Sequence, residues 1–146
     1  MEKKLTNTAF CYACAGLALG VFYREFTRMM GFTGETALSV LHTHSLMLGM
    51  VMALVLLLLE RTFSLFSQKR ALTTWRLYQT GLMVTLLGLL GRGLFQVTVA
   101  DTADNGYKAL NASLSGISGL GHILLAAGLV WLLHLLKKAV EVSPQD

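Results

Sequence analysis

The chain carries few charges. Only 14% of its 146 residues are Asp, Glu, Lys or Arg, whereas a soluble domain carries about 25%. Mean hydropathy is +0.59, and the charges lie between long uncharged runs at 5–23, 36–59, 77–91 and 109–136. Crossing the hydrocarbon of a bilayer takes about 20 mostly apolar residues. These features exclude an ordinary soluble domain and predict an integral membrane protein.

The uncharged runs predict four membrane-spanning helices. We expect spans at about 6–30, 36–59, 75–99 and 109–136, the third of them with Arg92 inside. The loops between the spans are short, and short loops favour antiparallel packing of neighbouring helices. The expected fold is an all-α membrane protein, a four-transmembrane-helix antiparallel bundle that forms a single domain over residues 1–146.

Proline and cysteine are also scarce. The one proline, Pro144, follows the last span, so no span carries a proline kink. The two cysteines form a Cys11-x-x-Cys14 pair with no histidine after it, which excludes the covalent haem-attachment motif. We interpret them as small apolar residues of the first span. Glycine is frequent, and Gly16-x-x-x-Gly20 is a weak indication of a helix-association face.

Basic residues gather on one side of the predicted topology. By the positive-inside rule that side faces the cytoplasm, so we expect a bacterial cytoplasmic membrane protein with both termini inside, and no nucleic-acid surface. The alternative is a signal peptide ending at Ala13-Cys14-Ala15, but the apolar run continues past that point, as a span does. The inner set is Lys3, Lys4, Arg61, Lys69, Arg70, Arg76, Lys137 and Lys138, against Arg24, Arg28 and Lys108 outside.

Ionisable residues inside the spans fall in one layer, the outer half of the bundle. At 1.5 Å per residue, His42 and His44 lie roughly 9 and 12 Å into the second span, and Arg92 lies about 12 Å from the outer end of the third. His122 lies near the middle of the fourth span. Such residues are costly in a bilayer and are candidates for function. Further polar residues mark the outer ends of the first two spans: Tyr23, Arg24, Glu25 and Glu35.

This layer has the residue types that a haem site needs. Histidine is the commonest side-chain metal ligand, and haem also requires small residues beside the ring and basic residues near its propionates. Residues spaced three or four apart share a helical face. The second span offers His42, Ser45, Gly49 and Ala53, the fourth offers Ser115, Ser118, Gly119, His122 and Ala126, and Arg92, Arg24 and Arg28 lie outward of the histidines.

The two histidines of the second span cannot serve the same iron. They are two residues apart, so they project about 200° from each other on a helix. One is a candidate axial ligand, and the other is left to bind a propionate, face a partner subunit or ligate a second haem. Met47 and Met50 are further candidate axial ligands. His134 lies beside Lys137 near the inner end, and we interpret it as interfacial.

Three segments resemble a family of small bacterial four-helix membrane proteins catalogued as a domain of unknown function. They are Phe22–Thr27, Leu41–Gly49 and Gly121–Ile123, and the resemblance covers nearly the whole chain. The second segment is also similar to the helix of haem-copper oxidase catalytic subunits that donates a haem ligand. The resemblance implies a minimal b-type membrane haemoprotein that forms a homodimer.

The oxidase likeness leaves the ligand open. Aligned on Leu-His-Thr the ligand would be His42, and aligned on His-x-x-x-Met-or-Leu it would be His44, which we favour. The adjacent histidine pair of an oxidase copper centre is not visible in the sequence. Oxygen reduction of the oxidase type is therefore not expected.

The sequence thus favours a membrane protein that binds haem b through His44 and His122, with His42 as the alternative ligand. Arg92 and Arg24 are the expected propionate partners. Ligation by two histidines leaves no open position on the iron, which favours electron transfer or redox or haem sensing, although an enzymatic role stays open. No redox partner or quinone is identified. The alternatives are a small transporter or channel subunit with a buried His/Arg/Glu relay, and a structural subunit.

Overall fold

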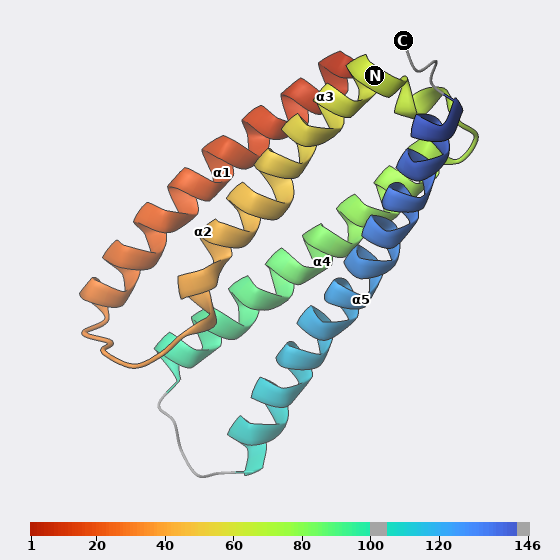
Figure 1. Cartoon of the computed structure of the whole chain (residues 1–146). Coiled ribbons are helices and arrows are strands. Elements are labelled where there is room, and N and C mark those ends of the chain that lie inside the picture. Colours follow the sequence, from red (N-terminus) through yellow and green to blue (C-terminus); the bar gives the residue numbers. More distant parts are fainter. Residues whose placement is uncertain (100–104, 143–146) are drawn as a thin grey trace.

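Four long helices form the protein, which is described over residues 1–99 and 105–142 by a computed structural model (Figure 1). Successive helices run in opposite directions, and each is long and apolar enough to cross a bilayer. The prediction of an all-α, four-span antiparallel bundle is confirmed, and the chain is a multi-pass membrane protein. Pro144 lies outside the described residues. The spans are α1 (Glu2–Met29), a composite second span (Ala37–Phe63), α4 (Ala71–Thr98) and α5 (Asn105–Val142).

Most of the helices extend beyond their apolar runs, chiefly at one end of the bundle. α1 begins at Glu2 rather than near residue 6, and α5 continues to Val142 rather than ending near 136. The polar ends can stay helical because each residue added to a helix gains a backbone hydrogen bond. At this end Arg61 donates to the Glu2 carboxylate at 2.9 Å, which ties α1 to the end of the second span.

The second span is not a uniform α-helix. It begins with the 3-10 turn η1 (Ala37–Val40), where the Thr36 hydroxyl accepts from the Leu38 N–H at 3.3 Å. It continues through α2 (Leu41–His44), the π-helical segment η2 (Ser45–Val51) and α3 (Met52–Phe63). π-Helical turns are rare in proteins, and those that occur are often found at functional sites. Here the π-helical segment directly follows the two histidines.

Two tyrosines hold η2 in place. Tyr78 of α4 donates its hydroxyl to the Leu48 carbonyl at 2.9 Å. The Tyr12 ring of α1 lies directly against Gly49, where any side chain would collide with it. Ser45 donates to the Tyr12 carbonyl at 3.1 Å. Because an unpaired backbone group inside a bilayer costs several kcal/mol, the Tyr78 hydroxyl stabilises this part of the second span.

Replacing Tyr78 with Phe is therefore expected to lower the free energy of unfolding by about 1 kcal/mol, the usual worth of one such hydrogen bond. Unfolding in mixed micelles of increasing dodecyl sulfate content, followed by circular dichroism, measures the change. Tyr107→Phe is the matched control, because no described residue is hydrogen-bonded to the Tyr107 hydroxyl and its ring stacks on Phe95. Equal stability of the Tyr78 variant and the wild type would contradict the role of this bond.

α4 and α5 pack closely because glycines line their contact. A Cβ added at Gly121 would lie 2.5 Å from the Thr85 backbone nitrogen, and one at Gly128 would lie 2.8 Å from that of Tyr78. Small residues allow helices in a membrane to approach to this extent. This contact fixes the level of each α5 residue relative to α4 and thereby places His122 near Thr85.

Large apolar side chains cover the outside of the bundle. Phe10 is 70% exposed and Ile123 is 66% exposed, an arrangement that is unfavourable in water and suits lipid. The interior has two clusters of buried side chains. One, around Leu56, Tyr78 and Leu132, fills the half that contains the start of α1, and a smaller one around Leu38 and Leu89 fills the other half.

Candidate histidine site

The two histidines of the second span point to opposite sides of it. The His42 ring faces α1, where a Cβ added at Gly20 would lie 3.7 Å from its Cγ. His44 faces α5 instead, where its ring meets the ring of His122. Within the described residues, the buried Nδ1 atom of His42 has no hydrogen-bond partner.

His44 and His122 form a pair across two helices. Their ring centroids are 5.7 Å apart, and the ring planes are nearly perpendicular at 87°. His44 Nδ1 lies 2.8 Å from the Val40 carbonyl, and His122 Nδ1 lies 2.8 Å from the Ser118 carbonyl. A carbonyl can only accept, so each Nδ1 must carry the proton. In a neutral ring, each Nε2 then has a free lone pair.

The helix faces beside this pair differ from the expected small-residue faces. On the second span, Ser45 and Gly49 pack against Tyr12, so α1 occupies the face that was expected to admit a ring. On α5, Ser118 lies against Gly88 of α4 and is buried, contrary to expectation. A Cβ added at Gly119 would meet nothing within 4 Å, so α5 is open there, one turn from His122.

Arg92 lies about 10 Å outward of the histidine pair, because it follows Thr85 by seven positions at 1.5 Å per residue. It is half-buried, and its Nε donates to the Asn111 side-chain oxygen of α5 at 3.0 Å. Its side chain borders a polar pocket of about 500 Å³ that Tyr23, Glu35 and other residues also line. No carboxylate in the described parts of the chain forms an ion pair with Arg92.

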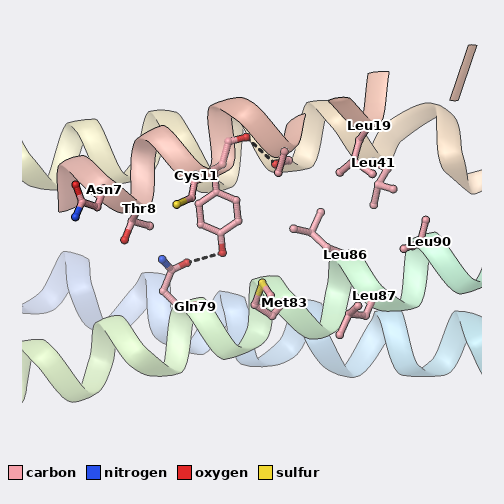
Figure 2. Close-up of a pocket in the computed structure, with 13 residues that line it drawn as sticks. Asn7, Thr8, Cys11, Leu19, Leu41, Gln79, Met83, Leu86, Leu87 and Leu90 are labelled. Atoms are coloured by element: carbon pink, nitrogen blue, oxygen red, sulfur yellow. Dashed lines mark hydrogen bonds between the residues drawn. The ribbon is translucent and has the colours of Figure 1, made fainter. Parts of the chain in front are cut away.

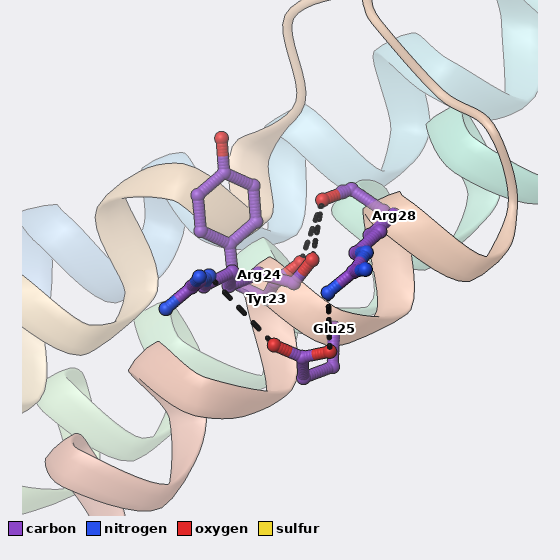
Figure 3. Close-up of polar contacts among 5 residues, drawn as sticks. Tyr23, Arg24, Glu25 and Arg28 are labelled. Atoms are coloured by element: carbon purple, nitrogen blue, oxygen red, sulfur yellow. Dashed lines mark hydrogen bonds and ion pairs between the residues drawn. The ribbon is translucent and has the colours of Figure 1, made fainter.

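Arg24 is not brought to the histidines. Its side chain is 80% exposed and lies 3.7 Å from a Glu25 oxygen. Arg28 approaches the other oxygen of Glu25 at 4.0 Å, so one carboxylate serves two exposed arginines (Figure 3). Glu25 therefore pairs with its neighbours on α1 rather than with Arg92.

Two amide side chains near Arg92 were not among the residues predicted from the sequence. Asn111 accepts from Arg92, and Gln96 accepts from the Ala37 N–H at 2.8 Å through its side-chain oxygen. Their presence within or beside apolar runs was the available signal, because uncharged polar groups in a membrane also need partners. They connect α4 to α5 and to the start of the second span.

Other candidate residues lie elsewhere. Met47 is 60% exposed on the surface, and His134 lies three turns from His122 along α5. Cys11 and Cys14 are free thiols at exposed positions. Gly16 and Gly20 face Leu46 and His42 of the same chain, so this motif serves packing within the bundle.

A separate groove of about 550 Å³ opens between α1, α2 and α4 (Figure 2). Leucines such as Leu19, Leu86 and Leu90 line one end, and Tyr12 donates to the Gln79 side-chain oxygen at 3.1 Å towards the other. None of the four histidines lines it. It is an apolar groove distinct from the His44–His122 pair.

A protein-only metal centre is not formed by the described residues. Among residues 1–99 and 105–142, no group of three or more His, Cys, Asp or Glu side chains is placed to hold a metal ion. The His44–His122 pair offers two nitrogens, and zinc sites in proteins use three or four protein ligands. The pair alone does not supply the ligand set of a zinc site.

Comparison with known proteins identifies one relationship. Residues 1–139 match the family described as "Protein of unknown function (DUF2871)". No curated protein and no solved structure matches the chain significantly. The resemblance to a catalogued domain of unknown function is confirmed at that level, while the likeness to haem proteins stays a prediction. Because the match covers nearly the whole sequence, the chain belongs to the DUF2871 family of proteins of unknown function.

Proposed function

We propose that this protein binds haem b in the membrane and acts in electron transfer or in redox or haem sensing. His44 and His122 are the proposed axial ligands. The observation that carries the proposal is their pairing across α2 and α5, with ring centroids 5.7 Å apart. Two axial ligands of one iron have to reach it from two different helices, and His44 and His122 approach each other from α2 and α5.

The hydrogen bonds of the pair support a ligand role. Metal-binding histidines almost always donate their other ring N–H to a carbonyl or carboxylate, which fixes the ring and the tautomer. His44 and His122 both do so, to carbonyls four residues earlier. With their Nδ1 atoms held by these carbonyls, His44 and His122 would both offer Nε2 to the iron.

The donor count supports haem over a bare metal ion. Two histidines leave a bare ion short of ligands, but a haem iron takes four ligands from the porphyrin and needs only axial ones from the protein. The open surface of α5 at Gly116 and Gly119 leaves room beside His122 for a flat ring. Bound haem would supply one-electron redox chemistry.

The proposal assigns a role to each histidine of the second span and to His122. His44 and His122 would hold the iron, one from α2 and one from α5, and binding by both would favour electron transfer over catalysis. His42 lies on the far side of the second span and is kept as the alternative ligand.

Arg92 is the stronger of the two proposed propionate partners. It is half-buried and has no carboxylate partner in the described residues, whereas Arg24 is exposed and paired with Glu25. A charge-assisted hydrogen bond contributes about 1.5–3 kcal/mol. Arg92→Gln is therefore expected to weaken haem affinity about tenfold or more, while Arg24→Gln changes it less than twofold. Haem titration of the apoprotein measures both, and equal effects would contradict the assignment.

Orientation and assembly complete the proposal. Glu2 and Val142 lie at the same end of the bundle, the end with the larger set of basic residues. By the positive-inside rule this end lies in the cytoplasm of a bacterial cell. We propose a homodimer in which a second copy covers the open face of α5 around Gly116 and Gly119, because a haem bound there would otherwise face lipid.

A small transporter or channel subunit is the second candidate. The observation that favours it is the polar set around Arg92, Asn111 and Gln96, which borders a polar pocket and could relay ions or protons. Titrating haem into the purified apoprotein separates the candidates. Saturable binding with a Soret band supports the haem protein, and a featureless spectrum at every haem concentration favours the transporter.

A further inference from the structure

A basic groove lies at the end of the bundle where α4 begins and α5 ends. Its volume is about 860 Å³. Lys69 and Arg70, from the segment before α4, face Lys138 and His134 of α5 across it. Further along α5 the lining becomes apolar, with Trp131 and then alanines. The groove is therefore polar and cationic at one end and apolar at the other.

The cations of this groove are not neutralised by the protein. Within residues 1–99 and 105–142, neither Lys69, Arg70 nor Lys138 forms an ion pair with a carboxylate. Three uncompensated positive charges near a membrane surface attract anionic lipid head groups, each with about 1 kcal/mol. The charge of this end therefore specifies an anionic ligand.

The apolar part has the length of a lipid chain in one leaflet. From Lys138 to Ala126 the groove follows α5 for twelve residues, or about 18 Å at 1.5 Å per residue. Half of a hydrocarbon core of about 30 Å is about 15 Å. Ala126 and Ala127 are small and exposed beside Val130, which is 67% exposed, so they form a trough along the helix.

Arg70 occupies its position despite an unfavourable backbone. Its φ is 80°, in the left-handed region that glycine and asparagine tolerate better than other residues. Packing does not require arginine there, because the residue is exposed. The exposed Arg70 side chain adds its positive charge to the lining of the groove.

We propose that this groove binds one anionic phospholipid. The phosphate lies between Lys69, Arg70 and Lys138, and an acyl chain follows the trough at Ala126 and Ala127. The proposal does not rest on the haem function: its charged end is far from the histidine pair, and its apolar end at Ala126 comes within one turn of His122. Lys138 is sixteen residues from His122, about 24 Å along α5.

Native mass spectrometry of the full chain tests the proposal. The protein is released from detergent with equal amounts of phosphatidylglycerol and phosphatidylcholine that carry identical acyl chains. We expect one retained phosphatidylglycerol per chain, preferred about tenfold or more over phosphatidylcholine. Equal retention of the two lipids by the wild type would overturn the proposal.

Two triple variants separate a built site from general surface attraction. Lys69→Gln, Arg70→Asn and Lys138→Gln together are expected to remove the preference. The control triple Lys3→Gln, Lys4→Gln and Arg76→Gln removes the same charge from the same end outside the groove and should keep it. An equal loss in both would overturn the proposal. Arg70→Asn alone should not lower the unfolding temperature, because asparagine suits this backbone.

The acyl chain has its own test. Ala127→Phe fills the trough and is expected to reduce retention of phosphatidylglycerol at least fivefold, whereas Ala112→Phe, at an exposed position elsewhere on α5, should leave it unchanged. Wild-type retention in Ala127→Phe would show that no chain lies along α5 and would overturn the proposal.

Discussion

Alanine at His44 or at His122 is expected to abolish stable haem binding, with at least a hundredfold loss of affinity. Removing a residue that hydrogen-bonds to a metal-bound histidine already lowers metal affinity 10–100-fold. These variants remove an axial ligand itself, so the loss of affinity should be larger. The loss should be seen as a missing Soret band after purification. Either variant alone should have nearly the full effect, because each histidine is one of only two protein groups proposed to hold the iron.

Two other histidines provide matched controls. His42→Ala removes an imidazole from the same turn of the second span but from the side that faces Gly20, and His134→Ala removes one from α5 at the far end of the bundle. Both variants should retain haem. Loss of haem in His42→Ala with retention in His44→Ala would reverse the ligand assignment.

Carbon monoxide tests whether the iron has an open position. With two histidine ligands, the spectrum of the reduced protein should not change when the gas is added. A shifted Soret band would indicate five-coordinate iron. Gas binding or catalysis would then be a possible function, and the result would argue against a role in electron transfer alone.

The second large effect is expected at the contact of α4 and α5. Gly121→Ala places a methyl group 2.5 Å from the Thr85 backbone nitrogen, and backbone atoms cannot rotate away as a side chain can. Overpacking costs 1–3 kcal/mol and occasionally more. We expect a loss of about 3 kcal/mol or more in the free energy of unfolding, measured by denaturation in mixed micelles.

The same substitution on the facing helix serves as the control. A Cβ at Gly91 of α4 would meet only a Leu114 side-chain carbon at 3.6 Å, an ordinary contact, so Gly91→Ala should be neutral or stabilising by about 0.5–1 kcal/mol, because alanine is the better helix former. If both variants unfold alike, the close approach of α4 and α5 is wrong, and the position of His122 relative to His44 is wrong with it.

The bundle was predictable because its physical cause is local. A run of about 20 apolar residues must span the hydrocarbon as a helix, whatever its neighbours are. The divergence of His42 from His44 followed from helix geometry alone, although it left open which one faces α5. The π-helical segment was not predictable, since it depends on Tyr12 and Tyr78 from two other helices.

The surroundings of the candidate site were predicted less well. Small residues at Ser45 and Gly49 indicated that something approaches the second span, but not that it is α1 rather than a cofactor. Arg24 was grouped with Arg92 by depth, yet depth does not show that Glu25 lies within reach of Arg24. Which helix fills a groove and which charge finds a partner depend on the packing of all four helices, and a single sequence does not show that packing.

The most direct test of the central claim is the absorption spectrum of the detergent-purified protein, recorded oxidised and then reduced with dithionite. The proposed ligation predicts a Soret band with sharp α and β bands on reduction, the signature of low-spin haem with two strong axial ligands. A featureless spectrum that persists after haem is added back would contradict it.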